Sequence, residues 1–221
     1  MMPESELIVA CVRTGSLYGM DYVTKLRNMV SRNLRRPHVM VCLTDQPDRC
    51  EGVVFVDVTD LGLLGWFAKM VLFSLEWRGL SKVVYIDLDT VIIGDLLPLT
   101  AVAGEFAICQ NFARLAGVTN YPCKYNSSVM VIGGGQAGFI WTNFDKRRTL
   151  LLSRHMRHGD QAIIEDLYPT APYLQDMLPK GFFCNYRNLT GHPPKGASII
   201  NFGGSHKPHN CPIPWVQEAW Q

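Results

Sequence analysis

The sequence lacks several patterns that would assign it to a common class of protein. Its seven cysteines are odd in number and contain no C-x-x-C pair or zinc-ligand spacing, so we expect free thiols in a reducing compartment. The longest apolar stretch, residues 61–77, is interrupted by Lys69 and Glu76, and a membrane span needs roughly 18 uninterrupted apolar residues. The first six residues are acidic, whereas a secretory signal begins with basic residues. These absences predict a cytoplasmic protein with no membrane span.

The chain also has little net charge. Its 21 Lys and Arg residues and 19 Asp and Glu residues give a formal net charge of +2, which argues against nucleic acid as the main partner. Hydrophobic residues make up 48% of the 221 positions, enough for a sizeable core. We find no internal repeat, low-complexity segment or linker, so the sequence predicts one domain over residues 1–221.

The pattern of apolar residues predicts a parallel α/β arrangement. Residues 7–12 are expected to form a central strand, followed by a helix over residues 21–34 with Asp21 as its N-cap and a second strand over residues 38–43. Ligands of such sheets bind at the carboxyl ends of the strands, which places Arg13 and Tyr18 on that rim. The other expected elements are strands at 53–56, 106–109, 125–132 and 198–202 and helices at 66–77, 137–152 and 159–167.

Residues 83–93 carry the strongest functional signal. An apolar run leads into Asp87 and Asp89, and further apolar residues follow, so the sequence predicts one buried strand with two carboxylates where it leaves the core. Side chains alternate along a strand, so both carboxylates are expected on the same side. Two carboxylates that close repel each other and lose hydration, which a divalent cation such as Mg²⁺ or Mn²⁺ would relieve. We therefore predict a divalent-metal site here.

Two further features are consistent with an anionic ligand. Lys69 lies on an apolar stretch, where a lysine either extends to water or reaches an anion in a cleft, and the pattern alone leaves both possibilities open. Near the end of the chain, Gly203 and Gly204 precede Lys207. Two glycines before a lysine suit a turn that approaches phosphate closely.

Together these motifs resemble the GT-A fold glycosyltransferases of the glycogenin and lipopolysaccharide galactosyltransferase type (family 8), especially its short bacterial relatives. The resemblance covers nearly the whole chain and rests on three motifs: D-x-D at 87–89, G-D-Q at 159–161, and F-x-G-x-x-K-P at 202–208. Asn126-Ser127-Ser128 also resembles the N-S-G segment that lines the sugar pocket in that family. The resemblance implies an α/β fold of GT-A type, with a central mixed, mostly parallel sheet flanked by helices.

The same resemblance implies a role for each site residue. The metal would be bound by Asp87, Asp89 and, through its side-chain carbonyl, Asn201. The family's histidine ligand falls at Asn201 or, in the short bacterial forms, at Gly203, and this sequence has a histidine at neither position. The nucleotide-binding residues would be Arg13, Tyr18, Lys69, Asp87, Gly204 and Lys207. The residues beside the reacting sugar carbon would be Asn126, Asp160 and Gln161.

The implied function is transfer of a sugar from a UDP-sugar donor to an unknown acceptor, which could be a glycan, a lipid, a protein or a small molecule. The resemblance implies dependence on Mn²⁺ or Mg²⁺ and retention of configuration at the anomeric carbon. Because the family histidine is replaced, a catalytically impaired protein that only binds nucleotide sugars is an alternative.

Two other interpretations fit parts of the sequence. Residues 87–91 match the D-x-D-x-T/V motif of haloacid-dehalogenase-type phosphatases, although that motif normally opens the fold and here follows other strands. Residues 133–138 match the G-x-G-x-x-G pattern of dinucleotide-binding folds. That motif is weak alone, and a tight turn between a strand and a helix explains these glycines more simply.

Overall fold

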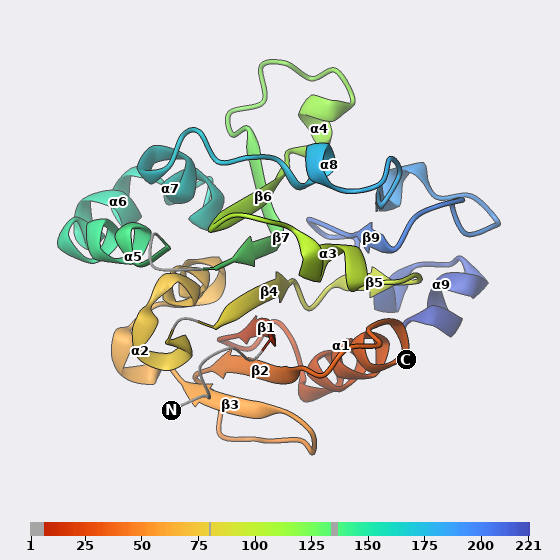
Figure 1. Ribbon diagram of the computed structural model, residues 1–221, viewed down its shortest axis with the longest axis horizontal. Helices are drawn as coiled ribbons and strands as arrows, with labels where there is room; N and C mark the ends of the chain where they lie inside the picture. The colour runs from red at the N-terminus through yellow and green to blue at the C-terminus, as the bar shows by residue number, and fades with distance from the viewer. Residues whose placement is uncertain (1–6, 80, 134–136) are drawn as a thin grey trace.

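A six-stranded mixed sheet forms the centre of the molecule. The computed structural model describes residues 7–79, 81–133 and 137–221, and its strands lie in the order β3-β2-β1-β4-β7-β6 (Figure 1). Strands β1 to β4 are parallel, whereas β7 runs antiparallel to both β4 and β6, which confirms the expected mixed, mostly parallel sheet. The strand bounds are β1 Leu7–Arg13, β2 Val39–Thr44, β3 Val54–Asp57, β4 Lys82–Ile86, β6 Phe106–Gln110 and β7 Tyr125–Ile132.

A second sheet has three strands in the order β5-β9-β8, with bounds Thr90–Ile92, Ile199–Asn201 and Phe183–Asn185. The chain leaves the large sheet at the end of β4 and enters this small sheet at β5. The prediction of one continuous strand over residues 83–93 is therefore wrong. A turn at residues 87–89 interrupts it, held by hydrogen bonds from the amide of Asp87 to the Ser128 carbonyl (2.8 Å) and from the amide of Thr90 to the Asp87 carbonyl (3.1 Å).

Both faces of the large sheet are covered. In β1, Leu7, Val9 and Cys11 belong to one buried cluster and the intervening Ile8, Ala10 and Val12 to another, as expected for a strand buried on both sides. The first cluster packs against helix α1 (Met20–Asn33) and the small sheet. The second packs against the 3₁₀ segment η2 (Gly65–Phe73) and helices α5 (Ala137–Lys146), α6 (Arg148–Arg154) and α7 (Asp160–Leu167).

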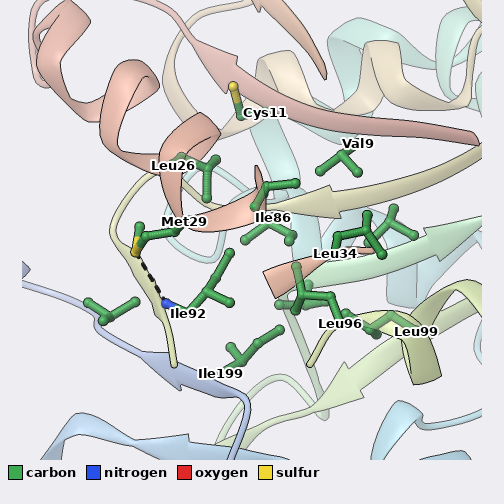
Figure 2. Close-up of a cluster of buried hydrophobic side chains, with 14 of the residues drawn as sticks. Val9, Cys11, Leu26, Met29, Leu34, Ile86, Ile92, Leu96, Leu99 and Ile199 are labelled. Atoms are coloured by element: carbon green, nitrogen blue, oxygen red, sulfur yellow. Dashed lines mark hydrogen bonds between the residues drawn. The ribbon is translucent and has the colours of Figure 1, made fainter. Parts of the chain in front are cut away.

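Helix α1 fixes the position of the small sheet. Figure 2 shows Leu26 and Met29 of α1 beside Ile86, Ile92 and Ile199, which come from β4, β5 and β9. The amide of Ile92 donates a hydrogen bond to the sulfur of Met29 at 3.3 Å. The apolar face of α1 thus holds the two sheets together at the point where the chain passes from one to the other.

Three helix predictions differ from the structure. The expected helix over residues 66–77 is the 3₁₀ segment η2 followed by a short α-helix, α2 (Leu75–Arg78), whose N-cap Ser74 accepts a hydrogen bond from the Glu76 amide. The expected helix over residues 137–152 is divided into α5 and α6. Helix α1 begins at Met20 with Gly19 as its N-cap, so the prediction of Asp21 as the cap is wrong.

The remaining elements are short. Helix α9 lies beside α1, and the guanidinium of Arg32 donates hydrogen bonds to the carbonyls of Ala219 (2.8 Å) and Gln221 (2.9 Å). Among the helices of the described residues, none has the length and apolar character required to cross a bilayer. The other short elements are η1 Thr59–Leu61, α3 Leu97–Ala101, α4 Phe112–Leu115, α8 Leu174–Met177, η3 Tyr186–Asn188, η4 Pro208–Asn210 and α9 Pro214–Ala219.

The hydroxyl of Tyr125 makes a testable contribution to this fold. It lies fully buried, donates to the Tyr168 carbonyl at 2.9 Å and accepts from the Ala171 amide at 2.8 Å. Tyr125→Phe removes both bonds and leaves the buried Ala171 amide without this partner, so we expect a loss of about 1–3 kcal/mol in the free energy of unfolding, measured by urea denaturation. The control is Tyr121→Phe, whose exposed hydroxyl has no hydrogen bond to the described residues. Equal stability of both variants would contradict the prediction.

Candidate functional site

Polar side chains from both sheets, from two helical segments and from the loop after β9 lie around the turn at residues 87–89. Asp87 and Asp89 meet Lys69 of η2 and Lys207 of the segment after β9. Asn126 lies at the start of β7, Asp160 begins α7, and Asn201 ends β9. The site therefore forms where the chain passes from the large sheet to the small one, at the carboxyl end of β4, as the fold type predicts.

The Asp87 carboxylate lies close to a lysine and to a second carboxylate. It accepts hydrogen bonds from Lys69 Nζ at 2.8 Å and from the hydroxyl of Tyr85 at 2.5 Å. Burial raises its pKa, the ammonium of Lys69 lowers it, and the neighbouring charge of Asp89 raises it again, with a net value of about 6. When Asp87 is ionised, the charge of Asp89 repels it. A cation beside the two carboxylates would reduce that repulsion.

Lys69 forms an ion pair with Asp87, and the charge of Asp160 also acts on it. Its ammonium lies 2.8 Å from Asp87 and 3.3 Å from the hydroxyl of Ser127. Burial by itself would lower the pKa of Lys69, but the charges of Asp160 and Asp87 raise it to about 12. Of the two possibilities left open by the sequence, the structure shows the second: Lys69 points into an acidic site and does not extend to bulk water.

Asp89 belongs to a separate hydrogen-bonded group. Its carboxylate, in a residue only 6% exposed, accepts from Lys207 Nζ at 2.6 Å and from the hydroxyl of Tyr18 at 3.0 Å. Lys207 Nζ also donates to the Tyr18 hydroxyl at 2.8 Å. Burial, followed by the charge of Asp89, raises the pKa of Tyr18 well above its usual range, so the phenol stays protonated and acts as a donor.

A row of small polar residues connects Asn201 to Asn126. The amide nitrogen of Asn201 donates to Ser128 Oγ, which donates in turn to Asn126 Oδ1. Asn201 pairs with Thr90, the residue after Asp89, across β5 and β9. Its own Oδ1 is buried and has no hydrogen-bond partner among the described residues.

That orphaned oxygen is relevant to metal binding. Two carboxylates and one amide oxygen are hard ligands of the kind that Mg²⁺ and Mn²⁺ accept, and a buried polar atom without a partner calls for an explanation such as a bound ion. Within the described ranges, His, Cys, Asp and Glu side chains form no group of three or more that could hold a metal. A metal would therefore need an amide oxygen or ligand oxygens to complete its coordination, and the residues Asp87, Asp89 and Asn201 fit that requirement.

Asp160 is the third carboxylate of the site. It is 3% exposed, and burial raises its pKa, while Lys69 and the hydroxyl of Ser127 act in the opposite direction. One of its oxygens, Oδ2, is buried and has no partner among the described residues. The neighbouring Gln161 is half-buried, and its side-chain amide makes no hydrogen bond to the part of the chain that the structure describes. Both side chains thus retain hydrogen-bonding capacity for a ligand.

Two of the expected nucleotide-binding residues lie at the edge of this group. Arg13 ends β1, where its guanidinium pairs with Asp48 at 2.7 Å and donates to the Tyr18 carbonyl at 3.0 Å, so it supports the loop that carries Tyr18. Gly204 lies in an exposed turn with φ of +64°, a conformation that favours glycine, and a Cβ added here would meet no other atom within 4 Å.

Sequence reasoning missed the supporting hydroxyls. Tyr85, Ser127 and Ser128 hold Asp87, Lys69 and Asn201, respectively. The alternation of side chains in β4 places Tyr85 and Asp87 on one side, which was a usable signal for Tyr85. The two serines fall within the motif at 126–128, but the motif alone does not indicate which side chains they bind.

The charges of the site do not balance. Three carboxylates (Asp87, Asp89 and Asp160) face two ammonium groups (Lys69 and Lys207), and the raised pKa values of Asp87 and Asp160 reflect burial of this group of charges. With all five groups ionised, the net charge is −1. A divalent cation would reverse that sign and prepare the site for an anionic ligand.

No protein-family model matches the chain, and no curated protein sequence matches it significantly. Solved structures do match. The galactosyltransferase LgtC, in complex with donor and acceptor sugar analogues, has a TM-score of 0.71 at 12% identity, with 96% of this chain and 93% of that chain covered. The glycosyltransferase GlyE of Streptococcus pneumoniae TIGR4 has a TM-score of 0.69 at 15% identity, with 98% of this chain and 60% of that chain covered.

The bifunctional glycosyltransferase WbbM has a TM-score of 0.61 at 16% identity. The match covers 100% of this chain and 52% of WbbM. This chain therefore spans about 60% of GlyE, about half of WbbM and nearly all of LgtC. The structure has the fold of the GT-A glycosyltransferases, which confirms the fold class and the resemblance found in the sequence.

The link between Lys69 and Asp87 can be tested directly. Because the ammonium of Lys69 lowers the pKa of Asp87, we expect Lys69→Met to raise that pKa above its value of about 6. The measurement is a titration of ¹³C-labelled aspartate carboxyl groups by NMR, with the Asp87 signal assigned through Asp87→Asn. Lys146→Met, at an exposed position, is the control and should leave the Asp87 titration unchanged. A pKa that is unchanged or lower in Lys69→Met would refute the assigned pairing.

Proposed function

We propose that the protein is a glycosyltransferase that transfers a sugar from a UDP-sugar donor to an acceptor that is a glycan, a lipid, a protein or a small molecule. The observation that supports this most strongly is the turn between the two sheets, where two carboxylates and two lysines converge beside Tyr18. Carboxylates suit a metal, lysines suit phosphate oxygens, and an aromatic ring suits a nucleotide base. The GT-A fold adds independent support.

Asp87, Asp89 and the unpartnered oxygen of Asn201 would hold a divalent cation, Mn²⁺ or Mg²⁺. When bound, this cation supplies positive charge to the diphosphate leaving group. The cation binds to ionised Asp87 and not to the protonated form. We therefore expect metal affinity to weaken as the pH falls below about 6, where Asp87 takes up a proton.

The protein's own residues would complete the charge stabilisation. Lys69 pairs with Asp87 and Lys207 with Asp89, and each ammonium group could also contact phosphate oxygens. Arg13 would keep the Tyr18 loop in place beside the nucleotide, and Gly204 would allow close approach of the backbone to the diphosphate.

The sugar would lie between the diphosphate and α7. Asp160, buried and with one free oxygen, would stabilise the positive charge that develops on the sugar ring, while Gln161 and Asn126 would bind its hydroxyl groups. Retention of configuration would require one of two routes: Asp160 attacks the anomeric carbon as the diphosphate leaves and the acceptor then displaces Asp160, or the acceptor attacks on the side from which the diphosphate leaves while Asp160 stabilises the positive charge. All seven cysteines are free thiols, which suits the cytoplasmic setting that we propose.

The phosphatase alternative has less support. Its nucleophilic aspartate would correspond to Asp87, which follows the fourth strand and forms an ion pair with Lys69 at 2.8 Å. The structural neighbours described above are glycosyltransferases. The dinucleotide motif at 133–138 includes residues 134–136, which lie outside the described residues.

Release of UDP from donor sugars tests the proposal. We expect the protein to release UDP from at least one of UDP-glucose, UDP-galactose or UDP-N-acetylglucosamine in the presence of Mn²⁺, with water or added glycosides as acceptor. Asp89→Asn removes a charge from the predicted metal and lysine site, so we expect UDP affinity in a calorimetric titration to fall at least about tenfold.

The matched control is Asp95→Asn, which changes an exposed aspartate elsewhere. Tight UDP binding without release from any donor would favour the binding protein over the enzyme. Equal UDP affinity of the wild type and Asp89→Asn would rule out the assigned site.

The residue at position 201 should determine metal selectivity. Asn201→His replaces an amide oxygen by an imidazole nitrogen, a ligand better matched to borderline metals than to Mg²⁺, so we expect tighter Mn²⁺ binding and little gain for Mg²⁺. Electron paramagnetic resonance of free Mn²⁺ during titration gives the affinity without any assay of activity. The control is Asn188→His, an exposed position outside the site. Unchanged Mn²⁺ affinity would show that residue 201 does not contact the metal.

A further inference from the structure

Trp66 is exposed in a way that the other tryptophans are not. The chain has five tryptophans, all within the described residues, and Trp66 alone is in the exposed class, with 54% of its surface accessible. The indole N–H groups of Trp77 and Trp215 donate to backbone carbonyls, whereas that of Trp66 donates to none of the described residues. An exposed indole combines an apolar ring with a polar N–H group, which suits it to a binding surface when it lies beside a polar site.

The ring of Trp66 lies against the start of α7. A Cβ placed on Gly159 would lie only 3.0–3.2 Å from Cδ1, Cγ and Nε1 of the indole. Gly159 also has φ of +71°, so its conformation and the ring together favour glycine here. The next residue is Asp160, whose buried Oδ2 has no partner among the described residues. The indole is therefore a neighbour of the carboxylate proposed to face the reacting sugar.

The 3₁₀ geometry of η2 brings Trp66 and Lys69 onto one face. Three residues turn the chain by about 360° in a 3₁₀-helix but by about 300° in an α-helix, so residues i and i+3 are aligned only in the former. Lys69 extends from η2 to Asp87 at 2.8 Å. Trp66 lies one 3₁₀ turn, about 6 Å, from Lys69 along the same face. It is 54% exposed, whereas the Lys69 side chain is 12% exposed, so the face runs from the buried charges toward solvent.

The start of η2 is held in this position. The hydroxyl of Thr14, in the loop after β1, donates to the Gly65 carbonyl at 3.3 Å. The ring of Phe67 packs edge-on against Trp66 with a centroid separation of 6.2 Å. Contacts on both sides of Trp66 thus fix an indole that is still half exposed, which is the arrangement of a preformed binding surface.

We propose that Trp66 is a stacking surface for a hexopyranose ring at the entrance of the site, a contact that rests on the proposed glycosyltransferase function. One face of such a ring carries C–H groups, which pack on the negative face of an indole, and its hydroxyl groups remain free at the edge. Asp160 lies at that edge as a hydrogen-bond acceptor. The ring belongs either to the acceptor or to the sugar of the donor.

The test uses ¹⁹F NMR of the full chain labelled with 5-fluorotryptophan, in which Trp66→Phe identifies the Trp66 signal. The probes are UDP, UDP-glucose, UDP-galactose, and the methyl glycosides of glucose, galactose and N-acetylglucosamine. We expect at least one hexose compound to shift the Trp66 signal and UDP alone not to shift it. A shift by free glycosides identifies the acceptor as the source, and a shift confined to UDP-sugars identifies the donor.

Substitutions provide the second measurement. Trp66→Ala should weaken binding of the responding compound at least about fivefold, and Trp66→Phe should weaken it less, since an aromatic face remains. Affinity for UDP should be unchanged in both variants. Phe139→Ala, at another exposed aromatic residue, is the control and should bind as the wild type does.

Two results would overturn the inference while the proposed function stands: UDP binds but no hexose compound shifts the Trp66 signal, or Trp66→Ala binds every compound as the wild type does. A shift caused by UDP alone would also overturn it, because the ring would then respond to the nucleotide. Failure of the proposed function is recognised separately, because the wild type would then release no UDP from any donor, or would bind neither UDP nor any UDP-sugar.

Discussion

The site depends on a buried arrangement of opposite charges in which each carboxylate of the turn is held by a lysine from a different part of the chain. Lys69 lies 18 positions before Asp87 in the sequence, and Lys207 lies 118 positions after Asp89. Buried charges are costly unless they are paired and hydrogen-bonded, so loss of either lysine would leave a carboxylate uncompensated. These pairs therefore constrain the positions of η2 and of the segment after β9 relative to the turn.

The two sheets make this arrangement possible. If residues 83–93 formed one strand, Asp87 and Asp89 would both be directed by the pleat of the large sheet. Because the chain instead turns into the small sheet, Asp87 meets Lys69 and Tyr85, while Asp89 meets Tyr18 and Lys207. The turn thus presents two carboxylates to two different groups of donors. A ligand with several anionic oxygens could contact both Lys69 and Lys207 at this turn.

The same turn explains why a metal suits the proposed function even though the family histidine is replaced. The site has one more carboxylate than ammonium groups, and a diphosphate would add further negative charge. A divalent cation on the two carboxylates offsets both. In the proposed function Asn201 would supply an oxygen where the family has an imidazole nitrogen, which would change the preferred metal but not the need for one.

The sequence by itself determined the first strand, helix and second strand and the buried character of β1 and β4, and it singled out the carboxylates and lysines that the structure pairs, because periodicity and residue type are local properties. It did not determine the break after Ile86, since the apolar residues on both sides of the turn read as one strand. Nor did it show that η2 is a 3₁₀ segment, which is what brings Trp66 and Lys69 onto one face. Which lysine meets which carboxylate, and which oxygens of Asp160 and Asn201 remain without partners, depends on packing between residues far apart in the chain, and only the tertiary structure decides that.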